Sequence, residues 1–120
     1  IEDDVIIGGN AAVHQFTRIG KMAMIGGMTG VTTDVIPYGL SLGNRNYLEG
    51  INLIGLRRKN VPNKDILILT SAYKEIFKTS HMNENLKKLN GDFKNNKLVN
   101  EVVNFILKDK KRPICTPFSK

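Results

Sequence analysis

Residues 1–36 divide into six consecutive six-residue segments, and this period constrains the fold more than any other feature of the chain. The segments are IEDDVI, IGGNAA, VHQFTR, IGKMAM, IGGMTG and VTTDVI. The first residue of each is Ile or Val, and the fifth is small or β-branched. Neither an α-helix nor a simple alternating strand produces a period of six. The repeat predicts short strands joined at corners, with one aliphatic side chain per segment facing a narrow interior, as in a parallel β-helix.

The pattern changes at Pro37, and the chain is expected to fall into three parts. Residues 1–36 form the β-helix coils, the glycine-containing run 37–46 reads as a linking loop, and residues 47–120 form a small α-helical unit. A short helix is expected over 47–60, followed by helices with apolar stripes at helical spacing. Those stripes are Ile66, Leu69, Tyr73, Ile76 and Phe77, then Met82, Leu86, Leu89 and Phe93, then Leu98, Val99, Val102, Val103 and Ile106, before a basic tail KDKKRP.

Charge is distributed unevenly between these parts. Residues 1–36 hold two basic and four acidic residues, a net charge of −2, whereas residues 37–120 hold sixteen basic and seven acidic residues, a net charge of +9. The C-terminal part is therefore expected to attract an acidic partner, although a solvated lysine-rich helical face is the alternative interpretation.

Several function classes find no support in the sequence. No apolar run is long enough for a membrane helix, and no signal peptide is visible, so an integral membrane protein is not expected. The single cysteine, Cys115, excludes an intrachain disulfide and favours a reducing, cytoplasmic setting. A β-helical metal enzyme would need about three histidines, and His81 is far in pattern from His14. Nucleic-acid binding would rest on charge alone, without a stacking motif.

The runs IIGGNAAVHQF, IGG…GV..DV.PY and GN followed by N..GL.R give the chain a specific resemblance. It resembles the UDP-N-acetylglucosamine acyltransferases, the enzymes that catalyse the first step of lipid A synthesis. The similarity covers the whole chain, which corresponds to the C-terminal part of these enzymes. The resemblance implies two coils of a left-handed β-helix, with three hexads in each coil, and a C-terminal helical domain. It also implies a homotrimer with active sites between subunits and no cofactor.

The reaction implied by the resemblance moves a 3-hydroxyacyl group from acyl carrier protein to the 3-hydroxyl of UDP-N-acetylglucosamine. A histidine serves as general base, which suits the removal of a proton from a sugar hydroxyl. That histidine and the backbone oxyanion contact belong to a coil upstream of this segment. No catalytic residue is therefore assigned here, and the chain alone is expected to be inactive. Open strand edges at an uncapped first coil likewise indicate a piece of a longer protein.

Four positions match the family's UDP-N-acetylglucosamine contacts. His14 and Gln15 match a pair that faces the nucleotide sugar, and Asn52 and Arg58 match residues near the uridine and diphosphate. A planar, permanently charged guanidinium suits phosphate. Ile54 departs from the family, where a carboxylate that helps to hold the nucleotide is common.

Gly9, Met24 and Gly27 match the acyl-chain channel. With three hexads in each coil, Gly8 and Gly9 stack on Gly26 and Gly27, so two coils lack side chains at the same place. In the family, glycine at the position of Gly27 accompanies longer acyl chains. A tight corner repeated with the period is the alternative explanation of these glycines.

Two functions therefore remain open at the level of sequence. The first is a portion of an acyltransferase that binds UDP-N-acetylglucosamine and receives an acyl chain from an acidic acyl carrier protein. The second is a non-catalytic assembly module or an inactive remnant of such an enzyme.

Overall fold

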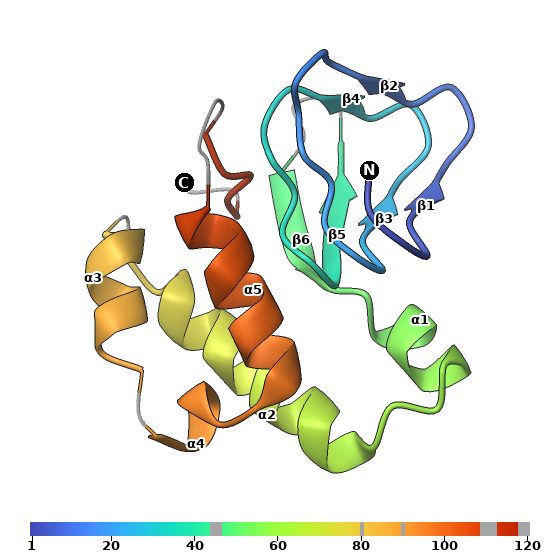
Figure 1. Cartoon of the computed structure of the whole chain (residues 1–120). Coiled ribbons are helices and arrows are strands. Elements are labelled where there is room, and N and C mark those ends of the chain that lie inside the picture. The colour runs from blue at the N-terminus through green and yellow to red at the C-terminus, as the bar shows by residue number, and fades with distance from the viewer. Residues whose placement is uncertain (44–46, 80, 90, 109–112, 118–120) are drawn as a thin grey trace.

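A computed structural model describes residues 1–43, 47–79, 81–89, 91–108 and 113–117 of the 120-residue chain. The N-terminal part winds as coils of short strands, and the helices gather beside it (Figure 1). The C-terminal end of the last helix returns toward the coils. The expected basic tail lies largely outside the described residues.

Four short strands establish the coil period. β1 (Ile6–Ile7) pairs in parallel with β3 (Met24–Ile25), and β2 (Ala12–Val13) pairs in parallel with β4 (Gly30–Val31). Ile7 lies opposite Ile25 and Val13 opposite Val31, so each partner lies three hexads further along the chain. Ile25 and Val31 are fully buried. The predicted parallel β-helix with three hexads per coil is confirmed for these residues.

The corners between strands recur with the same period of six. The fourth residue of each of the first five hexads has a positive φ, between 56° and 66°: Asp4, Asn10, Phe16, Met22 and Met28. Hydrogen bonds such as Ala11 N–H to the Gly8 carbonyl (3.3 Å) and Thr17 N–H to the His14 carbonyl (3.3 Å) close the turns. A positive φ at the third residue of such a turn is the geometry of a type II turn. Three corners therefore complete one coil.

The corner residues with a positive φ in these hexads are not glycines, so the glycines are not there to adopt that conformation. They are needed because neighbouring coils stack closely. A Cβ at Gly8 would lie 2.4 Å from the backbone nitrogen of Gly27 in the next coil. A Cβ at Gly20 would lie 2.3 Å from the nitrogen of Pro37. Real Cβ atoms do not approach other atoms this closely, so Gly8 and Gly20 must be glycine where the following chain passes over them.

The period shortens in the third coil. Ile19 forms a bridge with Val35, and Met24 of β3 pairs with Leu40 of β5 (Gly39–Leu42), so the partners are now closer in sequence than three hexads. Val35 thus takes the inward place that the first residue of a hexad would hold, and it is fully buried. The expected sixth hexad, VTTDVI, is therefore shorter than a full repeat in the stacked structure.

Two expectations for the following segment are wrong in part. The run 37–46, predicted as a loop, contains strand β5, which extends the parallel sheet of β1 and β3. The run 47–60, predicted as a helix, begins with strand β6 (Tyr47–Ile51), which pairs antiparallel with β5. Only Leu53–Arg58 is helical, as α1. Residues 39–42 are extended because they pair with the edge of β3, and this long-range pairing outweighs the local preference of the glycine-containing segment for a loop.

The helical unit consists of α2 (Asn63–Ile76), α3 (Met82–Lys87), α4 (Gly91–Lys94) and α5 (Lys97–Leu107). The predicted apolar stripes of α2 and α5 are buried, as shown by Ile66 and Leu69 on α2 and Val99 and Ile106 on α5. The stripe over residues 82–93 belongs to two short helices, α3 and α4, where one was expected. Asn96 caps α5 by accepting hydrogen bonds from the backbone N–H groups of Leu98 and Val99.

The chain after α5 returns to the coils, and its backbone hydrogen bonds connect the helical unit to the coils. The Asp34 N–H donates to the Pro113 carbonyl (2.8 Å), and the Cys115 N–H donates to the Asp34 carbonyl (2.7 Å). The Leu48 N–H donates to the Thr116 carbonyl (3.0 Å). We call residues 34–51 together with 113–117 the junction, because coil backbone and C-terminal backbone pair there.

Candidate functional site

Four of the sequence-predicted site residues, Gly9, Gly27, His14 and Gln15, lie at corners of the coils, whereas Met24 lies on β3, Asn52 caps α1 and Arg58 ends it. We call residues 8–11 and 26–29 the first corner, residues 14–17 the second corner, and residues 2–5, 20–23 and 36–39 the third corner. Each is a turn closed by a backbone hydrogen bond or marked by a positive φ. Phe16 at the second corner and Met28 at the first are exposed, whereas Met22 and Tyr38 at the third corner are buried.

His14 and Gln15 occupy the second corner. Both side chains are exposed, and the His14 backbone N–H donates to the Val31 carbonyl (2.9 Å), which fixes the start of the turn to the next coil. Phe16, which follows, has a φ of 66° and is 65% exposed. The turn presents an imidazole, an amide and an aromatic ring on the outside of the coil, so these groups can contact a molecule that lies against this corner.

Gly9 and Gly27 meet at the first corner, as the stacking predicts. The Met28 N–H donates to the Gly9 carbonyl (2.8 Å), and a Cβ at Gly27 would lie 3.2 Å from the Gly9 carbonyl oxygen. A Cβ at Gly9 would meet no atom within 4 Å. Met24 is half-buried nearby on β3, and Met28 is 71% exposed. The corner therefore has open space over Gly9, with flexible thioether side chains on the same segment.

Asn52 joins α1 to the third corner. Its backbone N–H donates to the Tyr38 carbonyl (2.7 Å), and its Nδ2 donates to the Met22 carbonyl (3.0 Å). Its Oδ1 accepts from the Gly55 N–H (3.1 Å), which caps α1. The side chain is only 5% exposed. Within this chain the Asn52 amide therefore holds α1 on the corner.

The last turn of α1 carries the predicted phosphate contact. Arg57 and Arg58 are exposed at the C-terminal end of the helix, where positive charge is favourable. Lys59 caps the helix, and its Nζ lies 3.4 Å from Asp4 Oδ1 across the third corner. Ile54 is 63% exposed on the same helix. The guanidinium groups are thus available to an anion from outside the chain.

The structure brings some of the predicted residues together and separates others. Gly9 and Gly27 share the first corner, whereas His14 and Gln15 stand at the second and Arg58 reaches out from the third. Figure 1 shows the β2–β4 side of the coils at the top and α1 at the opposite end. The predicted residues therefore do not gather at one corner of a single copy of the chain.

Buried titratable groups lie at the junction and the third corner. Burial raises the pKa of the Tyr38 phenol above its usual value, and the hydrogen bond from its hydroxyl to Glu101 Oε2 (2.8 Å) raises the pKa further. Burial raises the pKa of the Cys115 thiol to about 11. Both groups are therefore neutral at physiological pH, and their environment suits structural roles better than acid–base chemistry.

Sequence reasoning did not find the ion pair between Arg18 and Asp34. Arg18 Nε donates to Asp34 Oδ2 (2.9 Å), and the Arg18 backbone N–H donates to Asp34 Oδ1 (2.8 Å). Asp34 is 1% exposed. The two residues are closer in sequence than the three hexads of a regular coil, so only the shortened register of the third coil reveals that they are neighbours.

The described part of the chain contains no helix with the length and apolar character needed to cross a membrane. The same residues contain no group of three or more His, Cys, Asp and Glu side chains arranged to hold a metal ion.

These features define the class of protein. It is a hexapeptide-repeat protein: two coils of a left-handed parallel β-helix are followed by a small α-helical C-terminal domain. A sequence model described as "Udp N-acetylglucosamine O-acyltransferase; Domain 2" matches residues 34–115. The chain belongs to this UDP-N-acetylglucosamine O-acyltransferase family.

Individual relatives agree with the family assignment. The acyl-[acyl-carrier-protein]–UDP-N-acetylglucosamine O-acyltransferase of Paracoccus denitrificans is 42% identical over 117 residues, which is 98% of this chain and 44% of that protein. The solved UDP-N-acetylglucosamine acyltransferase of Campylobacter jejuni is 31% identical with a TM-score of 0.86, over 97% of this chain and 45% of that one. The Arabidopsis enzyme is 32% identical with the same TM-score, over 94% and 43%. The chain thus spans less than half the length of these relatives.

Proposed function

We propose that the chain is the C-terminal portion of a cytoplasmic acyltransferase of lipid A synthesis. The complete enzyme transfers a 3-hydroxyacyl group from acyl carrier protein to the 3-hydroxyl of UDP-N-acetylglucosamine. Residues 1–120 supply contacts to the nucleotide sugar and the acyl chain, and the general-base histidine lies outside them. The chain alone is then inactive. The family membership supports the reaction, and the distribution of candidate residues over separate corners supports a site between subunits.

The proposed nucleotide-sugar contacts divide between two copies of the chain. His14 and Gln15 face the sugar from the second corner of one copy, and Arg58 binds the diphosphate from the third corner of its neighbour. Exposed guanidinium groups at the end of α1 favour this role, because a planar fork with a permanent charge matches phosphate oxygens. Asn52 acts there chiefly through α1, since both ends of its amide are already engaged. The exposed Ile54 leaves the uridine without the carboxylate that the family resemblance implies.

A homotrimer supplies these neighbouring copies. Phe16 and Met28 are large apolar residues that are 65% and 71% exposed and also have a positive φ. Such a conformation is unfavourable for a side chain with a Cβ, and exposure of these side chains to water adds to the cost. Contact with a second copy at the corners would remove the exposure. These two residues support the assembly independently of the family.

The acyl chain is proposed to lie over the first corner. Gly9 leaves open space beside Gly27, and Met24 forms part of the adjoining wall. In a complete enzyme, Gly27→Met should shift the preference toward shorter acyl donors, measured as the ratio of kcat/KM for long and short 3-hydroxyacyl carrier proteins. The open position Gly9 offers a comparison, since Gly9→Ala adds one methyl group there without a clash. An unchanged chain-length profile in Gly27→Met would remove this corner from the channel.

We propose that the helical unit is a domain distinct from the coils. Its surface is the proposed docking site for acyl carrier protein. Residues 37–120 carry a net charge of +9, and acyl carrier proteins are acidic, so charge attraction would steer the two together.

The experiment that tests the proposal joins residues 1–120 to the N-terminal part of the Paracoccus denitrificans enzyme in place of its own corresponding segment. We expect acyl transfer to UDP-N-acetylglucosamine from the joined protein and none from residues 1–120 alone. A joined protein that folds and assembles but transfers no acyl group would favour a non-catalytic assembly module. Activity from residues 1–120 alone would contradict the placement of the base outside them.

A further inference from the structure

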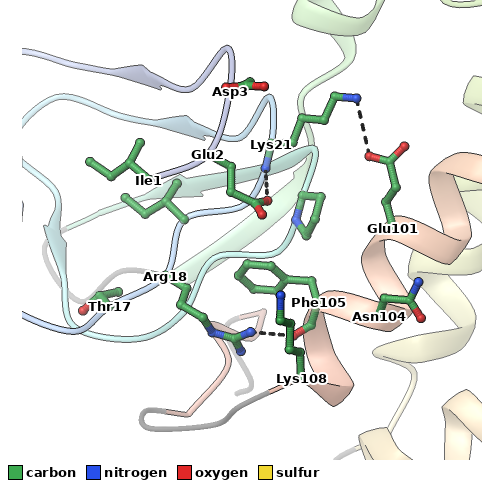
Figure 2. Close-up of a pocket in the computed structure, with 12 residues that line it drawn as sticks. Ile1, Glu2, Asp3, Thr17, Arg18, Lys21, Glu101, Asn104, Phe105 and Lys108 are labelled. Atoms are coloured by element: carbon green, nitrogen blue, oxygen red, sulfur yellow. Dashed lines mark hydrogen bonds and ion pairs between the residues drawn. The ribbon is translucent and has the colours of Figure 1, made fainter.

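A cavity of about 760 Å³ lies between the coils and α5; Thr17 of the second corner and Lys21 of the third line it, but none of the residues assigned to the proposed acyl-transfer site does. Its coil side is formed around Arg18 and Lys21, and its helix side around Glu101, Phe105 and Lys108 (Figure 2). The wall carries cations and carboxylates as well as apolar groups. A cavity with this mixture of groups suits a small polar ligand.

Arg18 is held rigidly in the wall of this cavity. Its Nε donates to Asp34 Oδ2 (2.9 Å), and its Nη1 donates to the Phe105 carbonyl (2.9 Å) near the end of α5. The guanidinium also lies 4.3 Å from the centre of the Phe105 ring, within the range of a cation–π contact. Two hydrogen bonds and a stacked ring thus fix the orientation of a group that is well suited to bind anions.

Polar atoms without partners converge on the same cavity. Among the described residues, four buried side-chain polar atoms have no hydrogen-bond partner, and three of these belong to cavity-lining residues. They are Arg18 Nη2, Thr17 Oγ1 and Glu101 Oε1. Buried polar atoms in native proteins are nearly always hydrogen-bonded to protein groups or ordered water, so three such atoms around one cavity indicate a site for water or for a bound polar molecule.

The wall has a donor end and an acceptor end. The Arg18 and Thr17 side chains can donate to an anion, and Lys108, one turn beyond Phe105, adds a second cation. Glu2 and Asp3 bring two further carboxylates to the wall, and Glu2 Oε1 accepts from the Lys21 backbone N–H (2.9 Å). At the other end Glu101 Oε2 already accepts from the Tyr38 hydroxyl (2.8 Å) and lies 3.6 Å from Lys21 Nζ. Glu101 Oε1 therefore remains as an acceptor for a donor group of the ligand.

We propose that this cavity binds a small phosphate ester that also carries a hydroxyl or amide N–H group. The phosphate oxygens lie against Arg18, Thr17 and Lys108, and the donor group of the ester meets Glu101 Oε1. A phosphate offers more acceptor oxygens than a carboxylate, so it can satisfy donors from both the coil and the end of α5. Such a ligand bridges the two parts of the molecule.

The test is a titration of the full chain with sn-glycerol 3-phosphate, methyl phosphate and glycerol, followed by NMR of the backbone amides. We expect saturable shifts at Thr17, Arg18 and Phe105 with both phosphates and none with glycerol. Glycerol 3-phosphate should bind about 3-fold tighter than methyl phosphate, because its hydroxyls can donate to Glu101. Equal affinity for the two phosphates would contradict the role of Glu101, and the absence of saturable shifts at these amides would overturn the proposal.

Variants locate the site without disturbing the fold. Thr17→Val keeps the shape of the side chain and removes its hydroxyl, and it should weaken glycerol 3-phosphate binding roughly 3- to 10-fold. Lys108→Ala should also weaken binding, whereas Lys94→Ala, an exposed lysine on α4, serves as the matched control and should not. If Lys94→Ala weakens binding as much as Lys108→Ala, the effect is a general response to net charge and the cavity is not the site.

Discussion

The stacked coils (residues 1–31) and the junction (residues 34–51 with 113–117) both contain short parallel pairings, but the junction adds the antiparallel pair β5–β6, and the two regions depend on different interactions. In the coils each partner lies three hexads further along the chain, and glycine at the second hexad position lets one backbone pass close over another. At the junction the partners are closer in sequence, and backbone from the C-terminal end is added beside Asp34. Buried charge accompanies this change: the Arg18–Asp34 pair has no counterpart among the described ion pairs of the coils. Regular coils therefore rely on backbone fit, and the junction on specific side-chain pairing.

The variant with the largest expected effect on stability disrupts the junction. Asp34→Ala removes a carboxylate that is 1% exposed and leaves the Arg18 guanidinium without its main partner. We expect the free energy of unfolding to fall by about 3 kcal/mol or more, since breaking a buried ion pair on one side leaves an uncompensated charge. Urea unfolding measures this change. Glu75→Ala, which removes an exposed ion pair with Lys78, is the control and should change it by less than about 0.5 kcal/mol. Similar losses in the two variants would contradict the dependence of the junction on the pair.

The next largest effect on stability is expected from variants that test the close backbone stacking of the coils. Gly8→Ala places a methyl group 2.4 Å from the Gly27 nitrogen, whereas Gly9→Ala places one in open space. We expect Gly8→Ala to destabilise by about 2 kcal/mol or more and Gly9→Ala to change stability by less than about 0.5 kcal/mol. The next coil lies against both residues, and they differ in that a Cβ would point into it only at Gly8. Equal thermal stabilities of the two variants would show that close stacking does not select glycine.

A smaller effect is expected where α1 meets the third corner. Asn52→Ala removes the cap of α1 and leaves the Met22 carbonyl without its side-chain donor. We expect a loss of about 1–2 kcal/mol in unfolding free energy. Asn100→Ala offers a comparison at an exposed asparagine on α5, where a helical backbone accepts alanine without strain. In the complete enzyme, Asn52→Ala should raise the KM for UDP-N-acetylglucosamine, because Arg58 depends on the position of α1. A variant with unchanged stability but lost substrate binding would instead make Asn52 a direct ligand contact.

The smallest effect concerns the Cys115 thiol at the junction. The thiol ionises at its usual pKa of 9.0 in the unfolded chain and near 11 in the folded one. The folded state therefore holds the proton more firmly, and unfolding free energy is unaffected below about pH 8 and falls as the pH rises toward 11. Between pH 8 and pH 10 this group should account for a loss of about 1 kcal/mol. Cys115→Ala should show a correspondingly shallower decline, and an identical pH dependence in the variant would contradict the raised pKa.

The coils could be predicted from the sequence because their register is local. One period of six predicts the strands and the inward residues, and the three hexads per coil that the family resemblance implies add the stacking of Gly9 on Gly27. The glycines at second positions were also visible as Ile-Gly pairs, although the reason for them, close passage of the next coil, needed the structure. The expected polar contacts at His14, Gln15 and Arg58 lie at exposed corners or helix ends, where the period itself directs side chains outward.

The junction could not be predicted in the same way because its coil pairings depart from the spacing of three hexads, and its other partner, the backbone of residues 113–117, is distant in sequence. β5 and β6 follow glycine-rich chain that reads as a loop, and only the edge of β3 selects their extended conformation. Nothing in the local sequence connects Asp34 with Arg18 or with the backbone of Cys115. The two hydrogen bonds that the Asn52 amide makes within the chain could not be predicted either. A sequence motif identifies a residue but does not show which hydrogen bonds its side chain already makes.

The central claim is that His14 and Arg58 serve one site from two copies of the chain, and mixing variants tests it directly. His14→Ala and Arg58→Ala versions of the joined enzyme, each inactive alone, would be produced together in equal amounts and assayed for acyl transfer. In a trimer with sites between subunits, about a quarter of the sites then carry both natural residues, so about a quarter of the activity should return. A mixture of His14→Ala with the His14→Ala, Arg58→Ala double variant should stay inactive. No recovery in the first mixture, with trimers formed, would place both residues in the same copy and contradict the account.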